Sequence, residues 1–131
     1  MIFVDSSAWF ARYTPRDRNH AAAEQFHSET RETLVTSDYV IDEVLTLLKV
    51  RGNVERAVRV GKALFAGDLA QIEWVTVADV EQAWTIFDKY RDKEWSFTDC
   101  VSLVMMQRLM IAKAVAFDAH FRQFGTVTVS P

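Results

Sequence analysis

Short apolar runs alternate along the chain with longer segments in which apolar residues recur every three or four positions. The short runs predict strands and the longer segments predict helices, because these are the periods of the two structures. The predicted strands are residues 2–4, 34–36, 72–77, 114–117 and 126–129. The predicted helices are residues 8–13, 20–32, 38–50, 54–66, a segment that includes 80–87, 95–106 and a short turn at 120–123. This alternation is typical of an α/β protein in which helices cover a parallel sheet.

Two of these helices carry specific predictions about burial. The helix around residues 80–87 has an apolar stripe that we expect to face inward, formed by Val80, Ala83, Trp84 and Phe87. The helix at 95–106 is apolar on nearly every side, so we expect it to be buried. Its single acidic residue, Asp99, lies on the same stripe as Leu103, Met106 and Met110.

Asp99 needs an explanation, because a buried carboxylate without a partner costs several kcal/mol or is neutralised. One explanation is a helix cap, in which Ser96 is the N-cap residue and Asp99 occupies the third helical position. The other explanation is that Asp99 belongs to a cluster of acids that comes together from distant parts of the chain.

The composition is that of an ordinary globular protein. The 131 residues fit one domain, and half of them are apolar and a quarter charged. Cys100 is the only cysteine, which excludes an internal disulfide or a cysteine-based zinc site and suits a reducing cytoplasm. No apolar run reaches the ~18 residues of a membrane span, and Asp5 interrupts the N-terminal run that would have to serve as a signal peptide. We therefore expect a cytoplasmic protein without a membrane segment.

Three further acids stand at the ends of predicted strands or at the border of a core helix. Asp5 and Asp118 each follow a short apolar strand directly, and ligands of parallel sheets bind beyond such strand ends. Either residue could instead form an Asx turn or a helix cap. Glu43 lies at the border of the apolar face of its helix, whereas Asp42 points away from that face. The alternative for Glu43 is a salt bridge with Arg51, two turns further along.

A joint site explains these acids more economically than four separate local roles. Carboxylates gathered within ~5 Å repel one another by roughly 3 kcal/mol per pair at an effective dielectric constant near 20. Such a cluster persists if its pKa values rise or if it holds a cation, and oxygen ligands alone select Mg²⁺ or Mn²⁺ rather than zinc. Ions held in this way catalyse phosphodiester hydrolysis. The formal net charge of −3 does not exclude a nucleic-acid substrate, because a metal would neutralise the clustered acids.

At these residues the chain resembles the PIN-domain ribonucleases, and most closely the VapC-like toxins of bacterial toxin–antitoxin modules. The resemblance is carried by IFVDSSAWF at the start, TSDYVIDEVLTLL in the middle, and KEWSFTDCVSLVMM followed by AVAFDAHFRQFG near the end. It implies a three-layer α/β/α PIN-like fold with a short, mostly parallel central sheet, in one domain of residues 1–131. It also implies a toxin that is an endoribonuclease and cleaves RNA with Mg²⁺ or Mn²⁺.

The resemblance assigns roles to individual residues. It implies that the metal-binding catalytic acids are Asp5, Glu43, Asp99 and Asp118. It further implies that Ser7 and Thr98 hold these acids or the attacking water, with local capping as the alternative. The chain departs from the family pattern at Ala116, where threonine is common, and at Ala119, where a basic residue often follows the last acid. These departures affect the fine tuning of Asp118 and a nearby phosphate contact.

Partners follow from the same resemblance, which implies a homodimer and a small antitoxin protein that blocks the site. We expect Trp9 and Phe10 to be exposed beside the first acid, where they are a candidate contact for the antitoxin. The basic residues that could line an RNA groove are Arg12, Arg16, Arg18, Lys49 and Arg51, although a solvated face explains them nearly as well.

The histidines and the large aromatic residues are expected to take no part in metal binding or base stacking. His20, His27 and His120 do not have the spacing of zinc ligands. His120, two residues after Asp118, could reach the site, but we expect a packed or solvated histidine there. The residues expected in the core or an interface, rather than as platforms for base stacking, are Trp9, Phe10, Trp84 and Trp95.

Three other functions fit parts of this sequence. A PIN-domain RNA-processing enzyme with a housekeeping role would share every residue and would differ in having no antitoxin gene beside its own. A phosphatase that forms an aspartyl phosphate would also place an aspartate after the first strand. It generally needs a lysine partner and a second aspartate two positions on, where this chain has Ser7. A non-catalytic module that binds RNA or protein would keep its function without the acids.

Overall fold

The computed structural model describes residues 1–51, 53–125 and 128–130. Its strands are β1 (Ile2–Val4), β2 (Leu34–Ser37), β3 (Gln71–Glu73), β4 (Lys113–Val115) and β5 (Thr128–Ser130). Its helices are α1 (Ser6–Arg12), α2 (His20–Glu29), α3 (Asp38–Val50), α4 (Val54–Phe65), α5 (Val77–Lys89), α6 (Phe97–Arg108) and α7 (His120–Gln123). Among these residues, no helix has the length and apolar character that crossing a membrane requires.

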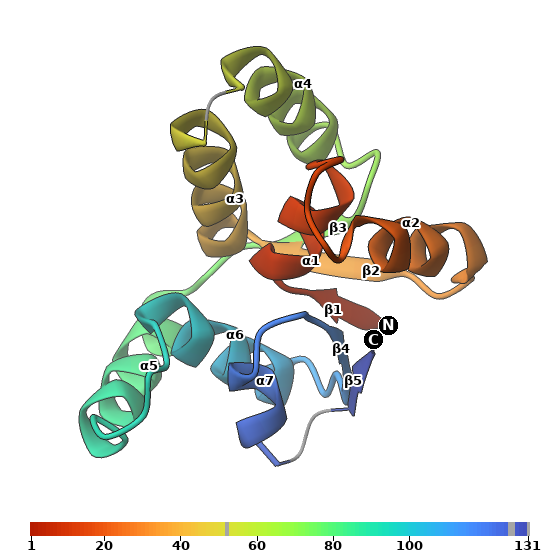
Figure 1. Ribbon diagram of the computed structural model, residues 1–131. Coiled ribbons are helices and arrows are strands. Elements are labelled where there is room, and N and C mark those ends of the chain that lie inside the picture. The colour runs from red at the N-terminus through yellow and green to blue at the C-terminus, as the bar shows by residue number, and fades with distance from the viewer. Residues whose placement is uncertain (52, 126–127, 131) are drawn as a thin grey trace.

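The five described strands form one parallel sheet in the order β3-β2-β1-β4-β5. The chain moves outward from β1 through β2 to β3 and then returns past them to β4 and β5. Crossovers between parallel strands are right-handed, so this reversal puts α1–α4 on one face of the sheet and α5–α7 on the other, as Figure 1 shows. The predicted three-layer α/β/α architecture is therefore confirmed. The reversal lies between β1 and β4, and ligands of such sheets bind beyond the strand ends at this point.

The α1 helix is largely buried, and the expected exposure of its aromatic pair is wrong. Trp9 is fully buried and Phe10 nearly so, because α1 packs against both α2 and α3. The Trp9 Nε1 donates a hydrogen bond to Thr36 Oγ1 at 3.2 Å, and its ring stacks on His27. These two aromatic residues belong to the core and are not an exposed contact for a partner protein.

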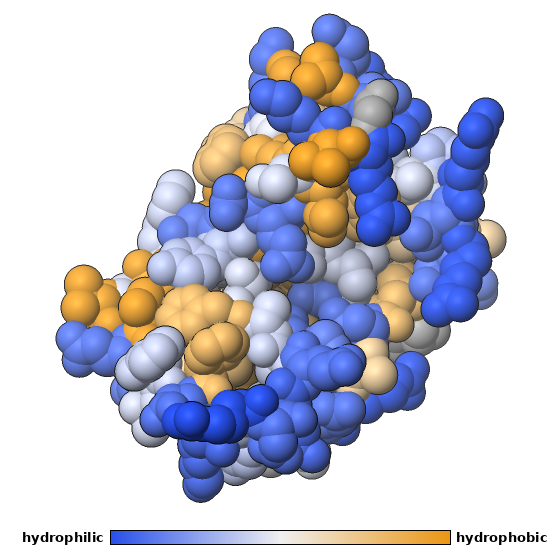
Figure 2. All heavy atoms as spheres, turned by 60° about the vertical axis from the view of Figure 1, so that its left-hand side comes forward, coloured by the Kyte–Doolittle hydropathy of each residue, from blue (hydrophilic) through white to orange (hydrophobic). Residues whose placement is uncertain are grey.

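The α5 helix packs on α6, and its predicted inward face is only partly correct. Ala83 is fully buried, but Trp84 is 60% exposed and Phe87 is 38% exposed. The two aromatic rings stack on each other outside the core. Figure 2 shows hydrophobic residues gathered over α5 at the lower left and over α3 and α4 above, with hydrophilic residues between them.

The α6 helix is buried as its sequence predicts, with eight buried residues: Asp99, Cys100, Val101, Ser102, Leu103, Val104, Met105 and Met106. Ser96 caps its N-terminus as expected. The helix ends at Arg108, so Met110 is not part of the buried stripe. Met110 instead follows the helix with a φ of 56° and is 90% exposed.

The remaining differences concern the ends of elements. The β3 strand covers residues 71–73 rather than 72–77, because Thr76 caps α5, which begins at Val77. The β4 strand ends at Val115, two residues before its predicted end, and α2 ends at Glu29. The α1 helix begins at Ser6, directly after its N-cap residue Asp5. The predicted last strand lies partly outside the described residues, and its described part begins at Thr128.

Candidate active site

The carboxyl ends of β1 and β4 lie side by side at the reversal of the sheet, and an acid follows each strand. Asp5 follows β1 directly, and its backbone N–H donates to the carbonyl of Val115 in β4 at 3.0 Å. Asp118 follows β4 three residues after its end. Glu43 comes from α3 and Asp99 from the first turn of α6. A groove of about 400 Å³ opens at this edge, and its polar lining includes Ser6, Ser7, Glu43 and Asp118.

Asp5 is both a helix cap and a member of the acid cluster. Its Oδ2 accepts hydrogen bonds from the backbone N–H of Ser7 (3.1 Å) and from Ser7 Oγ (2.6 Å). The same Ser7 Oγ accepts a hydrogen bond from the backbone N–H of Phe117 at 2.9 Å. Ser7 therefore ties the end of β1 to the segment that leads to Asp118. The other carboxylate oxygen of Asp5, Oδ1, is buried and has no hydrogen-bond partner among the described residues.

Glu43 is held by a serine rather than by the arginine considered as its alternative partner. Ser6 Oγ donates a hydrogen bond to Glu43 Oε1, and no ion pair between Glu43 and Arg51 occurs in the described chain. Glu43 is half-buried, and its neighbour Asp42 is exposed, as their positions on the helix predict. The guanidinium of Arg51 instead lies 5.3 Å from the centre of the Phe10 ring.

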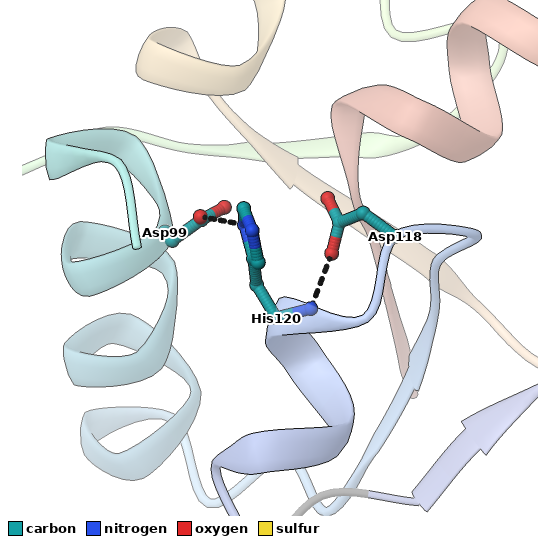
Figure 3. Close-up of side chains that lie close together, drawn as sticks. All are labelled: Asp99, Asp118 and His120. Atoms are coloured by element: carbon teal, nitrogen blue, oxygen red, sulfur yellow. Dashed lines mark hydrogen bonds and ion pairs between the residues drawn. The ribbon is translucent and has the colours of Figure 1, made fainter. Parts of the chain in front are cut away.

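Asp99 and Asp118 are joined through one histidine, as Figure 3 shows. The Nδ1 of His120 lies 2.8 Å from Asp99 Oδ2, and the backbone N–H of His120 donates to Asp118 Oδ1 at 3.1 Å. The same Asp99 Oδ2 accepts the backbone N–H of Ser96 at 2.9 Å, while Ser96 Oγ accepts the N–H of Asp99. The predicted cap of α6 is therefore confirmed, and it coexists with the acid cluster.

All four acids share one arrangement of their carboxylate oxygens. In each of them one oxygen accepts the hydrogen bonds described above. Within residues 1–51, 53–125 and 128–130, the second oxygen of each acid has no hydrogen-bond partner in the protein. Each side chain is thus fixed by one oxygen, and the other oxygen remains available to a ligand.

Burial and repulsion from neighbouring acids raise the pKa values of Asp5, Glu43 and Asp99. Burial raises the pKa of Asp5 well above its ordinary value, and the charges of Asp118 and Asp99 raise it further. Burial also raises the pKa of Glu43, where the hydrogen bond from Ser6 opposes the charges of Asp99 and Asp118. The pKa of Asp99 is raised by burial and by Asp118, against hydrogen bonds from Ser96 and His120. A bound cation would relieve this repulsion.

The donor set fits a divalent metal ion. Asp99, Asp118 and His120 each offer one ligand atom, and these atoms all lie within 4.8 Å of one another. The buried, unpartnered Oδ1 of Asp5 adds an oxygen that a cation would satisfy. Carboxylate oxygens are the ligands that Mg²⁺ and Mn²⁺ prefer. The geometry therefore supports a hard cation at the reversal of the sheet.

Of the other predicted site residues, some lie at the acids or in the groove and two do not. Ser7 holds Asp5, and Arg51 lines the groove together with Arg18. Thr98 is partly buried beside Asp99, and its side chain makes no hydrogen bond to the described residues. Arg12 lies outside the groove lining, where it contacts His27 at 3.3 Å and Glu24 at 4.0 Å. Lys49 is exposed near the end of α3 and does not line the groove either.

Sequence reasoning missed two residues of the site. His120, expected to be packed or solvated, contacts Asp99 directly, and the spacing Asp-x-His at the start of a helical turn is the signal that marks it. Ser6, which donates a hydrogen bond to Glu43, is the neighbour of the predicted site residue Ser7. Adjacent helical positions point about 100° apart, so Ser7 turns back to Asp5 while Ser6 faces α3.

Comparison with known proteins adds a family and close relatives. The family model for the PIN domain matches residues 2–127. The 23S rRNA-specific endonuclease VapC20 of Mycobacterium tuberculosis is 34% identical over 131 residues, covering 100% of this chain and 99% of that protein. Ribonuclease VapC26 of the same species is 28% identical over 136 residues, covering 99% of this chain and 100% of that protein.

The solved structures agree with this sequence similarity. The crystal structure of Mycobacterium tuberculosis VapC20, described as a sarcin-ricin loop cleaving toxin, has a TM-score of 0.93 and 34% identity, with 100% of both chains covered. A toxin–antitoxin complex from Klebsiella pneumoniae has a TM-score of 0.70 at 13% identity, covering 98% of this chain and 96% of that one. At that identity the second likeness concerns the fold alone.

Proposed function

The chain belongs to the PIN-domain family, and from that premise we propose that it is a metal-dependent endoribonuclease and the toxin of a toxin–antitoxin module. The observation that carries the proposal is the acid cluster at the reversal of the sheet. In each acid one carboxylate oxygen accepts hydrogen bonds, and the other, which in Asp5 is buried, has no partner among the described residues. We propose that residues 1–131 form a single nuclease domain around this site. Its similarity to two named ribonucleases over nearly their full length supports the same function.

The residues that would hold Mg²⁺ or Mn²⁺ are Asp5, Glu43, Asp99 and Asp118. Such an ion, when bound, activates water for hydrolysis of the phosphodiester bond and offsets the charge on the leaving oxygen. The protein supplies the positions of the acids: Ser7 holds Asp5, and Ser6 holds Glu43. Because these hydrogen bonds fix the two side chains, the carboxylates need little rearrangement to bind the ion.

The groove beside the acids would accept the RNA backbone. Arg18 and Arg51 line it together with Glu43 and Asp118, and their guanidinium groups offer charge that complements phosphates. Thr98, partly buried beside Asp99, is proposed to contact the attacking water. We propose that phosphates of the RNA contact these two arginines beside Glu43 and Asp118.

We propose ribosomal RNA, and within it the sarcin-ricin loop of 23S rRNA, as the substrate. This target is the one named for the relative VapC20. The support is the 34% identity over the full chain and the TM-score of 0.93. The partners would be a cognate antitoxin that blocks the groove and a second copy of this chain in a homodimer.

Mapping RNA ends tests the nuclease and its substrate together. The metal-free protein is incubated with ribosomes and, separately, with total bacterial RNA, in Mn²⁺ or in chelator. We expect one metal-dependent cut within the sarcin-ricin loop. Cleavage that survives chelator would contradict the metal requirement, and metal-dependent cuts elsewhere would contradict the substrate alone.

Two adjacent acids of α3 provide a matched pair of variants for this assay. Glu43→Gln removes a carboxylate of the cluster, and Asp42→Asn removes the exposed carboxylate next to it. We expect Glu43→Gln to abolish cleavage and Asp42→Asn to cleave like the wild type. Equal activity of the two variants would show that Glu43 has no part in the reaction.

The role as a toxin is tested in cells. Expression of the chain in a bacterial host should stop growth, and co-expression of the small protein encoded beside its gene should restore growth. The Glu43→Gln variant should leave growth unaffected. Normal growth on expression of the active nuclease would favour a housekeeping RNA-processing enzyme.

A further inference from the structure

His120 is the one residue that contacts two of the proposed acids through two different groups in the described chain. Its backbone N–H donates to Asp118 Oδ1, and its imidazole lies against Asp99 Oδ2. Asp118 belongs to the segment after β4, and Asp99 belongs to the first turn of α6. The side chain of His120 is 27% exposed and that of Asp99 is 6% exposed, so their bond is largely shielded from water.

The direction of the bond to Asp99 follows from chemistry. A carboxylate oxygen accepts hydrogen bonds, so the nitrogen 2.8 Å away must carry a proton. This bond requires a hydrogen on Nδ1. Asp99 Oδ2 then accepts two hydrogen bonds, from His120 and from the backbone of Ser96, and Oδ1 remains free.

We propose that His120 is a positioning residue of the metal site, which holds Asp99 through its ring and Asp118 through its backbone. This inference rests on the proposed function, because it concerns the same site. The two carboxylates come from elements that are separate in the chain. Among the described residues, His120 is the only residue whose hydrogen bonds link Asp99 to Asp118. The histidine thus fixes Asp99 and Asp118 beside each other, and one carboxylate oxygen of each lies within 4.8 Å of the other and of a ring nitrogen of His120.

Variants of the ring separate this role from others, because the backbone bond to Asp118 is retained in each. His120→Asn keeps a side-chain N–H near the position of Nδ1, whereas His120→Leu has a similar size and no donor. His20→Leu is a matched control, since His20 Nδ1 also makes a 2.9 Å bond, but to the carbonyl of Ala11. Chemical denaturation of the metal-free proteins first establishes that each variant folds.

The measurement is calorimetric titration of metal-free protein with Mn²⁺, without RNA. We expect wild type, His120→Asn and His20→Leu to bind Mn²⁺ with affinities within about threefold of one another. We expect His120→Leu to bind roughly 10–100-fold more weakly, as is typical when a group that orients a metal ligand is lost. The increase in Tm at a fixed Mn²⁺ concentration should follow the same order.

Each contrary result identifies what is wrong. If wild type and His120→Leu bind Mn²⁺ equally well, the positioning role is overturned while the proposed nuclease stands. If His120→Asn is as weak as His120→Leu, the ring acts through its other nitrogen, and the positioning role is again overturned. If wild type does not bind Mn²⁺ at all, the proposed function fails and the inference fails with it.

Discussion

Two neighbouring helices begin with the same local structure and use it differently. Thr76 and Ser96 are the N-cap residues of α5 and α6, and an aspartate stands three positions later in each helix. Both aspartates complete a capping box, and both are buried, with Asp79 1% exposed and Asp99 4% exposed. In the sequence, both helix N-termini have the pattern of a capping box, a Ser or Thr followed three positions later by an acid.

The two aspartates differ in the other side chains that their carboxylates contact. Arg108 donates to both oxygens of Asp79, from Nε and Nη2, each at 2.9 Å. Although burial acts in the opposite direction, the hydrogen bonds from Arg108 and Thr76 hold the pKa of Asp79 below its ordinary value. Asp99 meets His120 and other acids, and its pKa is raised. A satisfied carboxylate stabilises the fold, whereas one among other acids is available to a metal.

The largest effect that separates the two aspartates is expected in catalysis. Asp99→Asn should reduce RNA cleavage by at least about 10³-fold, beyond the 10–100-fold that loss of an orienting group typically costs. Its amide oxygen can still accept the N–H of Ser96, and loss of the charge removes repulsion. The metal-free variant should therefore gain about 1 kcal/mol in free energy of unfolding, measured by denaturant titration. A loss of metal-free stability would contradict the repulsion between Asp99 and the other acids.

The same substitution in α5 should have the opposite effect on stability. Asp79→Asn removes a carboxylate that Arg108 binds with two hydrogen bonds. We expect the free energy of unfolding to fall by about 2 kcal/mol, below the 3–5 kcal/mol of a fully buried pair because Arg108 is partly exposed. Denaturant titration measures this loss, and Mn²⁺ affinity serves as the control that should not change. An unchanged free energy of unfolding would show that the Arg108 pair contributes nothing.

The pH dependence of stability should also differ between the two sites. The raised pKa values of Asp5, Glu43 and Asp99 stabilise the metal-free fold below pH about 4, and this contribution is lost as pH rises through the raised values. Asp79 has a lowered pKa, so its contribution is present above that pH and is lost in stronger acid. Denaturation in chelator between pH 5 and pH 8 should show stability decreasing, with a smaller slope in Asp99→Asn. Equal slopes would contradict the repulsion.

The smallest effect is expected at the other end of α6, far from the acids. Met110 has a φ of 56° and is 90% exposed, in a left-handed conformation that favours glycine. Met110→Gly should raise the free energy of unfolding by about 0.5–1 kcal/mol, because the ~1–2 kcal/mol cost of a left-handed conformation is relieved and glycine's greater chain entropy offsets part of it. RNA cleavage and Mn²⁺ affinity should be unchanged. A decrease in stability would show that the Met110 side chain makes contacts that matter.

The sequence predicted the residues whose position depends on local structure. Asp5 and Asp118 follow strands, and Glu43 lies at the border of a helix face, so strand order and helical periodicity suffice to bring them to one edge. The cap of α6 also follows from four consecutive residues. The helices, the parallel sheet and the three layers were predictable for the same reason.

The errors concern contacts between segments that are distant in the chain. His120 and Asp99 are 21 positions apart, and their bond depends on where α7 lies against α6. Trp9 is buried because α2 and α3 both pack against α1. Trp84 is exposed because α5 packs on α6 with Ala83, rather than Trp84, in the buried contact. Periodicity shows which residues share a face of a helix, but the partner of that face is determined by the tertiary fold.

The most direct test of the metal site compares the thermal stability of three proteins with and without Mn²⁺. Wild type and Asp79→Asn should gain equally on addition of Mn²⁺, by about 2.7 kcal/mol at a concentration 100 times Kd. Asp99→Asn should gain little or nothing. An equal gain in Asp99→Asn, or the absence of any gain in wild type, would contradict the assignment of these acids as metal ligands.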